Sequence, residues 1–352
     1  MKRMDGGGED FGEEKDVTSE VHLGCPSNSS ALHVTHFTIP IPIPTGVDSC
    51  SCSGLFKRRE QVPMDKPLDV DDDGDLVLTR RSSYQDGGNV KLAIQHIITS
   101  SIRGVGLQVW KAELVLSDFV LHKMLFYSEF DGIISLELGA GTGLVGMLVG
   151  HVAKTVFLTD RGHKILANCG RNVHLNRNVL QYKGSINVRE LDWTNSWPPI
   201  VRPRNDSLHE RVWWTSSEVE EAENASVLLA ADVIYSDDLT DALFGLLETL
   251  MSLGSEKVLY LALEKRYNFS LGDLDIVANG YSHFRSYVRS EEECKEELES
   301  CSPFVGRCID LSRIPKYIRE YERGNDLELW EIKYDKQTHK SPRSQNSQLE
   351  FS

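Results

Sequence analysis

Short apolar runs alternate with segments of helical periodicity through the middle of the chain. The apolar runs predict strands over residues 133–138, 154–159, 185–190, 226–231 and 256–263. Helical spacing predicts helices near residues 109–121, 142–150, 163–176 and 239–253. This alternation is typical of a parallel sheet, because each crossover helix must lie on one face of it. We therefore expect an α/β fold with helices on both faces of the sheet.

The last third of the chain follows a different pattern. Residues 284–288 and 327–332 are predicted to be strands without a strong helical segment between them. In the second run, LELWEI, apolar and charged residues alternate, which is typical of an edge or hairpin strand. We expect the parallel sheet to end in an antiparallel hairpin. Val77 and Leu78, together with the run 90–102, are expected to form lead-in strands.

Both ends of the chain differ in composition from a packed domain. Residues 1–75 contain GGGED, SNSS, an IPIPIP run and an acidic cluster, so we expect a disordered or loosely ordered N-terminal arm there. The globular domain is expected over residues 76–335 and a flexible tail over residues 336–352. The N-terminus lacks the apolar core of a secretory signal, and no run of about 18 apolar residues predicts a membrane span.

The formal net charge of −15 narrows the classes of partner. An acidic surface repels phosphate backbones, so we do not expect direct binding of nucleic acid and favour a basic protein as partner. Seven cysteines, an odd number in a large chain, favour reduced thiols inside a cell. Cys294, Cys301 and Cys308 lack the tight pairing of a zinc site, and we interpret them as core or loop thiols.

A glycine-rich turn follows the first predicted strand of the sheet. The sequence ELGAGTG, residues 137–143, leads into a helical pattern, and its glycines let a ligand approach the helix N-terminus. The dinucleotide fingerprint G-x-G-x-x-G fails because its sixth position is Leu144. The acidic-x-G-x-G-x-G pattern instead resembles the nucleotide turn of S-adenosylmethionine-dependent methyltransferases. Asp160, which ends the next strand, is placed either to bind ribose hydroxyls or to cap the helix that begins near His163.

Further candidate residues follow the third and fourth strands. Asp192 and Trp193 supply a carboxylate and an indole that can receive adenine, although Trp193 can equally be a lid on the core. After the fourth strand, Ala231 leaves room for a bulky cofactor, and Asp232 and Tyr235 are expected to face the transferred methyl group. The alternative for this segment is an ordinary strand that ends in a helix cap.

Five motifs together resemble one family. VGLQVWKAELVL, LELGAGTG, LTD, LDW and ADVIY stand in the order and rough spacing of the seven-stranded protein-lysine methyltransferases, methyltransferase family 16. The resemblance covers about residues 75–335. It implies a seven-stranded Rossmann-like methyltransferase sheet, mostly parallel with an antiparallel C-terminal hairpin, and S-adenosyl-L-methionine as the cofactor.

The resemblance also assigns residues to the site. By residue type alone Trp110 is expected in the core, whereas the resemblance implies that it lines the cofactor pocket. The implied catalytic residues near the substrate amine are Asp232 and Tyr235, and no metal is implied. The implied cofactor-binding residues are Trp110, Glu137, Gly139, Ala140, Gly141, Asp160, Asp192, Trp193 and Ala231.

The activity that the resemblance implies is methyl transfer to a lysine of a protein substrate. This substrate is expected to be basic and nuclear, with the winged-helix and zinc-finger protein Kin as the leading candidate. The chain itself is expected to be a monomer in the nucleus, with the cytoplasm as a second compartment, and to bind neither nucleic acid nor membrane directly.

Two alternatives stay open: a nucleic-acid or small-molecule methyltransferase, and a cofactor-binding adaptor without turnover. DVIY, residues 232–235, lacks the prolines found in amino-methylating nucleic-acid enzymes, which disfavours the first.

A long segment separates the third and fourth strands. It runs from Asn195 to Asn224 and carries Trp197, Trp213 and Trp214. Tryptophans in such a segment form either a substrate-recognition flap or a structural cover in which they are buried. We favour the structural cover.

Overall fold

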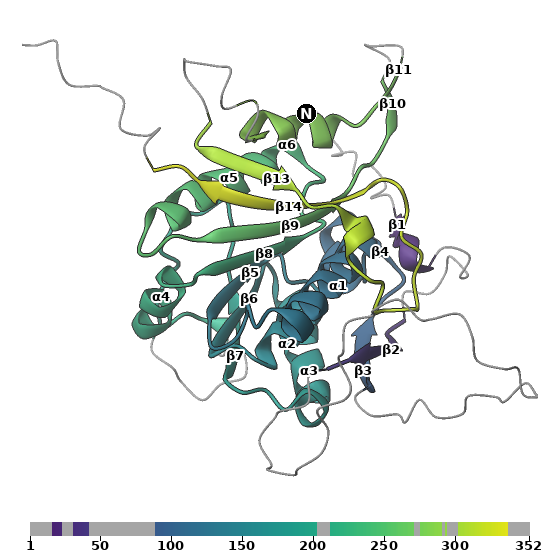
Figure 1. Ribbon diagram of the computed structural model, residues 1–352, viewed down its shortest axis with the longest axis vertical. Coiled ribbons are helices and arrows are strands. Elements are labelled where there is room, and N and C mark those ends of the chain that lie inside the picture. The colour runs from purple at the N-terminus through teal and green to yellow at the C-terminus, as the bar shows by residue number, and fades with distance from the viewer. Residues whose placement is uncertain are drawn as a thin grey trace, which may run out of the picture.

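The centre of the molecule is an eight-stranded sheet with the order β12-β13-β14-β9-β8-β5-β6-β7 (Figure 1). The computed structural model describes residues 16–22, 31–41, 89–202, 212–270, 275–290, 293 and 302–336. The strands from β9 to β7 are parallel, and β14 is antiparallel to both of its neighbours. The strands are β5 (Ile134–Leu138), β6 (Thr155–Asp160), β7 (Ser185–Glu190), β8 (Val227–Ala231), β9 (Val258–Glu264), β12 (Val288–Ser290), β13 (Phe304–Cys308) and β14 (Leu327–Tyr334).

Two sets of helices cover the two faces of this sheet (Figure 1). One core lies under α1, α2 and α3, and the other lies under α4, α5 and α6. Side chains of β8 alternate between the two cores: Val227 and Leu229 join the first, and Leu228 and Ala230 join the second. The helices are α1 (Lys111–Phe126), α2 (Leu144–Gly150), α3 (His163–Leu180), α4 (Ser216–Glu223), α5 (Asp237–Ser252) and α6 (Asn279–Tyr287). Within the described residues, every helix is too short or too polar to cross a membrane.

The predicted α/β architecture is confirmed. The five predicted parallel strands appear as β5, β6, β7, β8 and β9, and the four predicted helices appear as α1, α2, α3 and α5. The antiparallel C-terminal hairpin is also present, formed by β13 and β14. Seven strands follow the expected arrangement, and the short β12 is added beside β13 as an eighth strand at the edge.

The strand predicted over residues 284–288 is wrong. Phe284 lies in α6, and only Val288 belongs to a strand, β12. These two apolar residues are four positions apart, which is helical spacing, and Phe284 is fully buried beside the rings of Phe244 and Trp330. The true hairpin partner of β14 is β13, a short strand in which Gly306 leaves space for the side chains of its neighbours.

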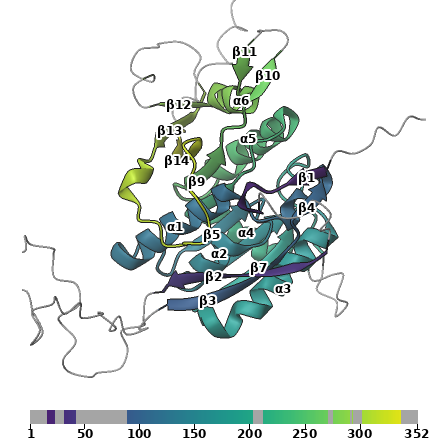
Figure 2. The same ribbon diagram turned by 90° about the vertical axis from the view of Figure 1, so that its right-hand side faces the viewer.

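Two N-terminal segments are folded against the domain (Figure 2). β2 (His33–Pro40) pairs with β3 (Asn89–His96), and β1 (Asp16–Thr18) pairs with β4 (Thr99–Ser101). The lead-in strands expected over residues 90–102 are therefore confirmed as β3 and β4. The expected loosely ordered arm is wrong for residues 16–22 and 31–41, because β3 and β4 offer edges for pairing and the core accepts apolar residues of β2. Val77, Leu78 and the tail beyond residue 336 lie outside the described residues.

A row of asparagines on α3 holds β3 in place. Asn176 accepts a hydrogen bond from the Ala93 N–H and donates one to the Ala93 carbonyl, both at 2.9 Å. Asn172 does the same for the backbone of Gln95, at 2.8 and 3.0 Å. These amides satisfy the backbone groups on the free edge of β3, so the β2–β3 ribbon is fixed to the domain. The remaining short elements are the 3₁₀ helices η1 (Glu20–His22), η2 (Ile102–Leu107) and η4 (Leu311–Arg313) and the strands β10 (Asn268–Ser270) and β11 (Asp275–Val277).

Candidate active site

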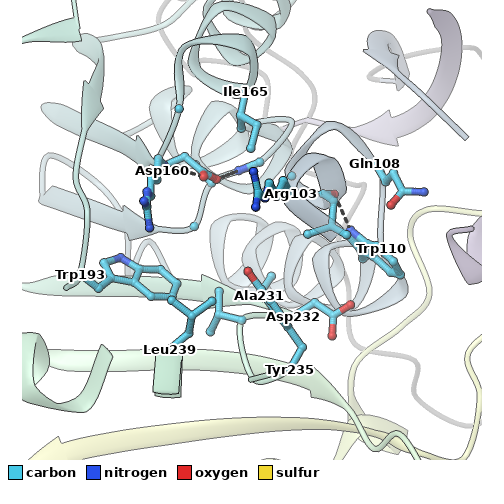
Figure 3. Close-up of a pocket in the computed structure, with 18 of the residues that line it drawn as sticks. Arg103, Gln108, Trp110, Asp160, Ile165, Trp193, Ala231, Asp232, Tyr235 and Leu239 are labelled. Atoms are coloured by element: carbon cyan, nitrogen blue, oxygen red, sulfur yellow. Dashed lines mark hydrogen bonds between the residues drawn. The ribbon is translucent and has the colours of Figure 1, made fainter. Parts of the chain in front are cut away.

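A cavity of about 760 Å³ lies at the carboxyl ends of the parallel strands. This is where ligands bind in open α/β sheets. All eleven residues predicted from the sequence line it, and Figure 3 shows Trp110 and Trp193 on opposite sides of the space. The predicted residues are Trp110, Glu137, Gly139, Ala140, Gly141, Asp160, Asp192, Trp193, Ala231, Asp232 and Tyr235.

The glycine turn forms the floor of the cavity. Gly139 and Gly141 have φ angles of +70° and +51°, in the left-handed region that glycine adopts without strain. A Cβ atom at residue 139 would lie 2.8 Å from Val233 Cγ1 and 3.3 Å from the Trp193 ring. The same atom at residue 141 would lie 3.1 Å from the Gly106 carbonyl oxygen. Only glycine therefore fits at these positions, which brings the backbone close to whatever occupies the cavity.

Asp160 connects the end of β6 to this turn. Its carboxylate accepts hydrogen bonds from the backbone N–H groups of Gly141 at 2.8 Å and Arg161 at 2.7 Å. Burial raises the pKa of Asp160 to about 6, although both hydrogen bonds oppose that rise. The N-cap of α3 is Gly162, so the alternative that Asp160 caps this helix is wrong. Its carboxylate lines the cavity instead.

Asp192 and Trp193 follow β7 on one side of the cavity. Asp192 accepts two hydrogen bonds from Thr194 and forms an ion pair with Arg161 at 3.2 Å. Trp193 is half-buried, and its ring packs against Gly139. The buried Trp193 Nε1 has no hydrogen-bond partner within the described part of the chain. Trp193 is thus a cavity wall with an unused donor rather than a sealed lid on the core.

Asp232 has an unusual backbone at the end of β8. Its φ of +56° is rare for a non-glycine residue, and its N–H donates to the Ala262 carbonyl at 2.9 Å. Such strained conformations cluster at functional sites. α5 begins after the N-cap residue Ser236, so the alternative that Asp232 is a helix cap is also wrong. Tyr235 lines the same cavity with 41% of its surface exposed, which places it at the entrance.

Arg266 completes the surroundings of Asp232, and the sequence reading missed it. Its guanidinium lies 2.5 Å from Asp232 Oδ2, 3.5 Å from Glu20 Oε1, and 4.9 Å above the Trp110 ring. Burial raises the pKa of Asp232, and the positive charge of Arg266 opposes that rise. Arg266 lies two residues beyond β9, and the mixed sequence of this loop gives no signal of the contact.

Glu113 is a second residue that the sequence reading missed. It lies on α1, is only 6% exposed and lines the cavity. Thr142 donates a hydrogen bond of 2.5 Å to its carboxylate, and burial raises the pKa of Glu113 to about 7. Glu137 accepts a hydrogen bond from the Gly146 N–H at 2.9 Å, and burial followed by the charge of Glu113 raises its pKa well above the ordinary value. A carboxylate among the apolar residues of α1 was the available signal for Glu113.

The described part of the segment after β7 packs as a structural cover, as favoured. Trp214 is 1% exposed and stacks on Phe157 of β6, with ring centroids 5.2 Å apart. Trp197 packs edge-on against Trp214 at 5.7 Å, and Arg202 lies over the Trp213 ring. Residues 203–211 of this segment, like Cys294 and Cys301, lie outside the described residues.

Residues 89–208 match the sequence model of a family described as lysine methyltransferase. Methyltransferase-like protein 22 of Homo sapiens is 35% identical over 244 residues, which cover 68% of this chain and 57% of that protein. The protein of the same name in Mus musculus is 36% identical over 68% of this chain and 58% of its own length. The chain therefore spans less than two thirds of these two relatives.

A shorter relative matches over nearly its whole length. Protein-lysine N-methyltransferase EFM6 of Saccharomyces cerevisiae is 27% identical over 246 residues, which cover 61% of this chain and 92% of that protein. The range 89–208 matched by the family model includes β5, β6, β7 and the glycine turn between β5 and α2. The resemblance seen in the sequence motifs is confirmed: residues 89–208 match the lysine methyltransferase family, and 68% of the chain is similar to methyltransferase-like protein 22 of Homo sapiens.

Proposed function

We propose that this chain is an S-adenosylmethionine-dependent protein-lysine N-methyltransferase. The observation that carries the proposal is that the glycine turn and the Asp232–Tyr235 signature line one cavity. A cofactor pocket and an amine-directed signature are useful to a methyltransferase only if they open into the same space. The match to the lysine methyltransferase family supports the same reaction class.

The residues of the cavity fit the cofactor. Glycines whose Cβ would collide with their neighbours give a flat cradle, and Trp193 offers an aromatic wall with an unused N–H donor. Asp160 supplies carboxylate oxygens to ribose hydroxyls, and Ala231 leaves space beside the sheet edge. When bound, the cofactor supplies a methyl group on a positively charged sulfur, which accepts the C–S electron pair as the lysine nitrogen bonds to the carbon.

The chain's own task is to deliver a neutral amine. A free lysine has a pKa near 10.4, so only about one in two thousand is neutral at pH 7. Asp232 and Tyr235 accept and orient the N–H groups of the incoming amine, and the proton leaves to water. An unpaired carboxylate would stabilise the ammonium and work against the reaction. Arg266 offsets the charge of Asp232, so this residue can orient the amine without holding it protonated.

The finer proposal concerns the substrate and its compartment. The net charge of −15 favours a basic partner, and a basic nuclear protein such as Kin meets that requirement. A monomeric enzyme acting in the nucleus, with the cytoplasm as a second compartment, is part of the same proposal.

The test uses the purified full chain with radiolabelled S-adenosylmethionine, first with nuclear extract and then with recombinant Kin. We expect a discrete labelled protein whose label maps to lysine. The Asp232→Ala variant should lose this label and keep its fold, while Asp238→Ala, in the first turn of α5, should keep both. Near-wild-type turnover in Asp232→Ala would remove the proposed role of Asp232. Label in nucleic acid, or cofactor binding without any label, would replace the proposal with the nucleic-acid enzyme or the adaptor.

A further inference from the structure

Glu113 occupies a position where a carboxylate is costly. It lies in the first turn of α1, and its neighbours Ala112, Leu114, Val115 and Leu116 are fully buried. Its side chain does not join this core and lines the cavity instead. Thr142, from the glycine turn, donates to one of its oxygens at 2.5 Å. Backbone N–H groups of Trp110 and Leu144 also hydrogen-bond to this carboxylate and lower its pKa, but burial outweighs them and raises the pKa overall.

Glu113 faces other acids rather than a compensating base. The charge of Asp232 after β8 raises the pKa of Glu113, and the charges of Glu113 and Asp160 raise the pKa of Glu137 on β5. The buried thiol of Cys169 on α3 faces the same group of acids. Among the described residues, neither Glu113 nor Glu137 belongs to an ion pair. Two buried carboxylates in one cavity need a cation or a proton.

The nearby bases are engaged with other acids. Lys111 pairs with Glu264 at 3.1 Å, and Arg266 pairs with Asp232. Arg161, which also lines the cavity, pairs with Asp192. These three bases therefore do not neutralise Glu113 and Glu137, and a cationic ligand in the cavity can do so.

We propose that Glu113 is a further cofactor-binding residue, which together with Glu137 binds the α-ammonium of the cofactor's methionine half and releases a proton as it does so. The assignment rests on the proposed function, since it takes the cavity as the cofactor site. Of the cofactor's polar groups, the ammonium matches two carboxylates, whereas the carboxylate of the methionine half would be repelled by them. Asp160, the last residue of β6, lies on the far side of the glycine turn from this pair in the sequence, and its carboxylate remains available for the ribose.

The proton balance follows from the state of the two acids without ligand. Burial raises the pKa of Glu113 to about 7, and burial together with the charge of Glu113 raises the pKa of Glu137 well above its ordinary value, so the pair holds a proton near neutral pH. A bound ammonium favours the ionised pair, so an O–H bond breaks and the proton passes to the buffer. Cofactor affinity should therefore rise with pH up to about pH 7, by about tenfold per pH unit for each proton released.

The experiment is calorimetric titration of the full chain between pH 6 and pH 8, in two buffers with different ionisation enthalpies. Three probes separate the contributions. S-adenosylmethionine carries both ammonium and sulfonium, S-adenosylhomocysteine keeps only the ammonium, and 5′-methylthioadenosine has neither but keeps the ribose. We expect more proton release with the first two probes than with the third. Any contribution of Asp160 should appear with all three, because all carry the ribose.

The decisive variant is Glu113→Gln, because its amide oxygen can still accept the hydrogen bond from Thr142. It should release fewer protons, show a correspondingly weaker pH dependence of affinity, and bind S-adenosylhomocysteine at least tenfold more weakly at pH 8. Its affinity for 5′-methylthioadenosine and its melting temperature should match those of wild type. Glu256→Gln, an exposed substitution of equal charge, should behave as wild type throughout.

Each outcome decides one question. Unchanged proton release and affinity in Glu113→Gln would overturn the assignment and leave the proposed function intact. Equal weakening with 5′-methylthioadenosine would also overturn it, because Glu113 would then only shape the cavity. If wild type binds neither S-adenosylmethionine nor S-adenosylhomocysteine at any pH, the proposed function itself fails.

Discussion

At the scale of single residues, the ion pair between Asp232 and Arg266 sets the charge of the reaction centre. Asp232 is nearly buried, and its side chain depends on Arg266 for compensation. Removal of one partner of such a pair leaves the other charge uncompensated in a poorly solvated place. The pair therefore links a residue of the family signature to a loop that the signature does not include.

We predict that Arg266→Gln lowers methyl transfer at least tenfold while cofactor affinity changes little. Without Arg266 the pKa of Asp232 rises further, so a larger fraction is protonated and unable to orient the amine. The acid limb of the pH–rate profile should move to higher pH. The measurement is initial rate against pH with the labelled cofactor.

Lys265→Gln is the matched control. It removes a cation from the neighbouring position, but Lys265 pairs with Glu328 of β14 at 2.5 Å rather than with Asp232. Its pH–rate profile should overlie that of wild type. An unshifted acid limb in Arg266→Gln would show that Asp232 does not depend on this guanidinium.

At the scale of elements, Asp118 fixes α1 to the connection between β13 and β14. Its fully buried carboxylate accepts hydrogen bonds from the N–H groups of Tyr317 and Ile318, from the Tyr321 hydroxyl at 2.6 Å, and from Arg323 at 2.7 Å. α1 also carries Glu113, so this network helps to position one wall of the cavity.

We predict that Asp118→Ala lowers the free energy of unfolding by about 3–5 kcal/mol, because Arg323 and two backbone N–H groups lose their common acceptor. Urea unfolding followed by circular dichroism measures this directly. Asp310→Ala, which removes the exposed cap of η4, should cost no more than about 1 kcal/mol. Similar midpoints for the two variants would contradict the special role of Asp118.

The elements of the central sheet could be predicted because their signals are local. Buried strands such as β8 are continuous apolar runs, and the glycine turn carries its own spacing. β13 and α6 could not be assigned from the same signals. FRSYV reads as a strand by composition, and only the pocket between Phe244 and Trp330 makes Phe284 a helical core residue.

The residues of the candidate site also fall into two groups, those that local sequence signals place and those that only tertiary packing places. Asp160 and Asp232 stand directly after strands, so the sheet topology alone brings them to one edge. Glu113 lies within a helix that is buried almost all round, and Arg266 lies in a loop. Their places in the cavity depend on how α1 and the loop after β9 pack. The periodicity of the sequence does not predict this packing.

At the scale of the whole molecule, the N-terminal segment reaches the reaction centre. Glu20 of η1 lies 3.5 Å from Arg266, and the Ser19 hydroxyl donates to the Val109 carbonyl beside Trp110. Gln108, which lines the cavity, donates to the Val17 carbonyl at 2.9 Å. More than two hundred residues of chain therefore separate groups that meet around Asp232.

A set of histidines holds this segment against β2 and β3. The His22 ring stacks on His96 with centroids 4.5 Å apart, and the His33 ring lies 6.2 Å from His96. Thr35 contacts His96 Nε2 at 2.8 Å. Burial, and then the charges of His96 and His33, lower the pKa of His22 to about 4, and burial lowers the pKa of His96 as well. The packing thus favours the neutral forms of His22 and His96.

We predict that His22 makes the stability of the protein fall as the pH is lowered from about 6.5 to 4. In this window the unfolded chain binds a proton at His22 and the folded chain does not, so acid favours unfolding. His22→Phe keeps a ring to stack on His96 and cannot be protonated. The difference in unfolding free energy between wild type and this variant should therefore shrink or change sign as the pH falls through the window.

Groups whose pKa is raised, such as Glu113, have the opposite pH dependence but cancel in this difference. Urea titrations at half-unit pH steps measure this difference. The protection factors of backbone amides in residues 16–22 against hydrogen exchange should fall over the same range in wild type alone. Parallel stability curves for the two proteins would mean that His22 is not the group through which acid loosens the N-terminal segment.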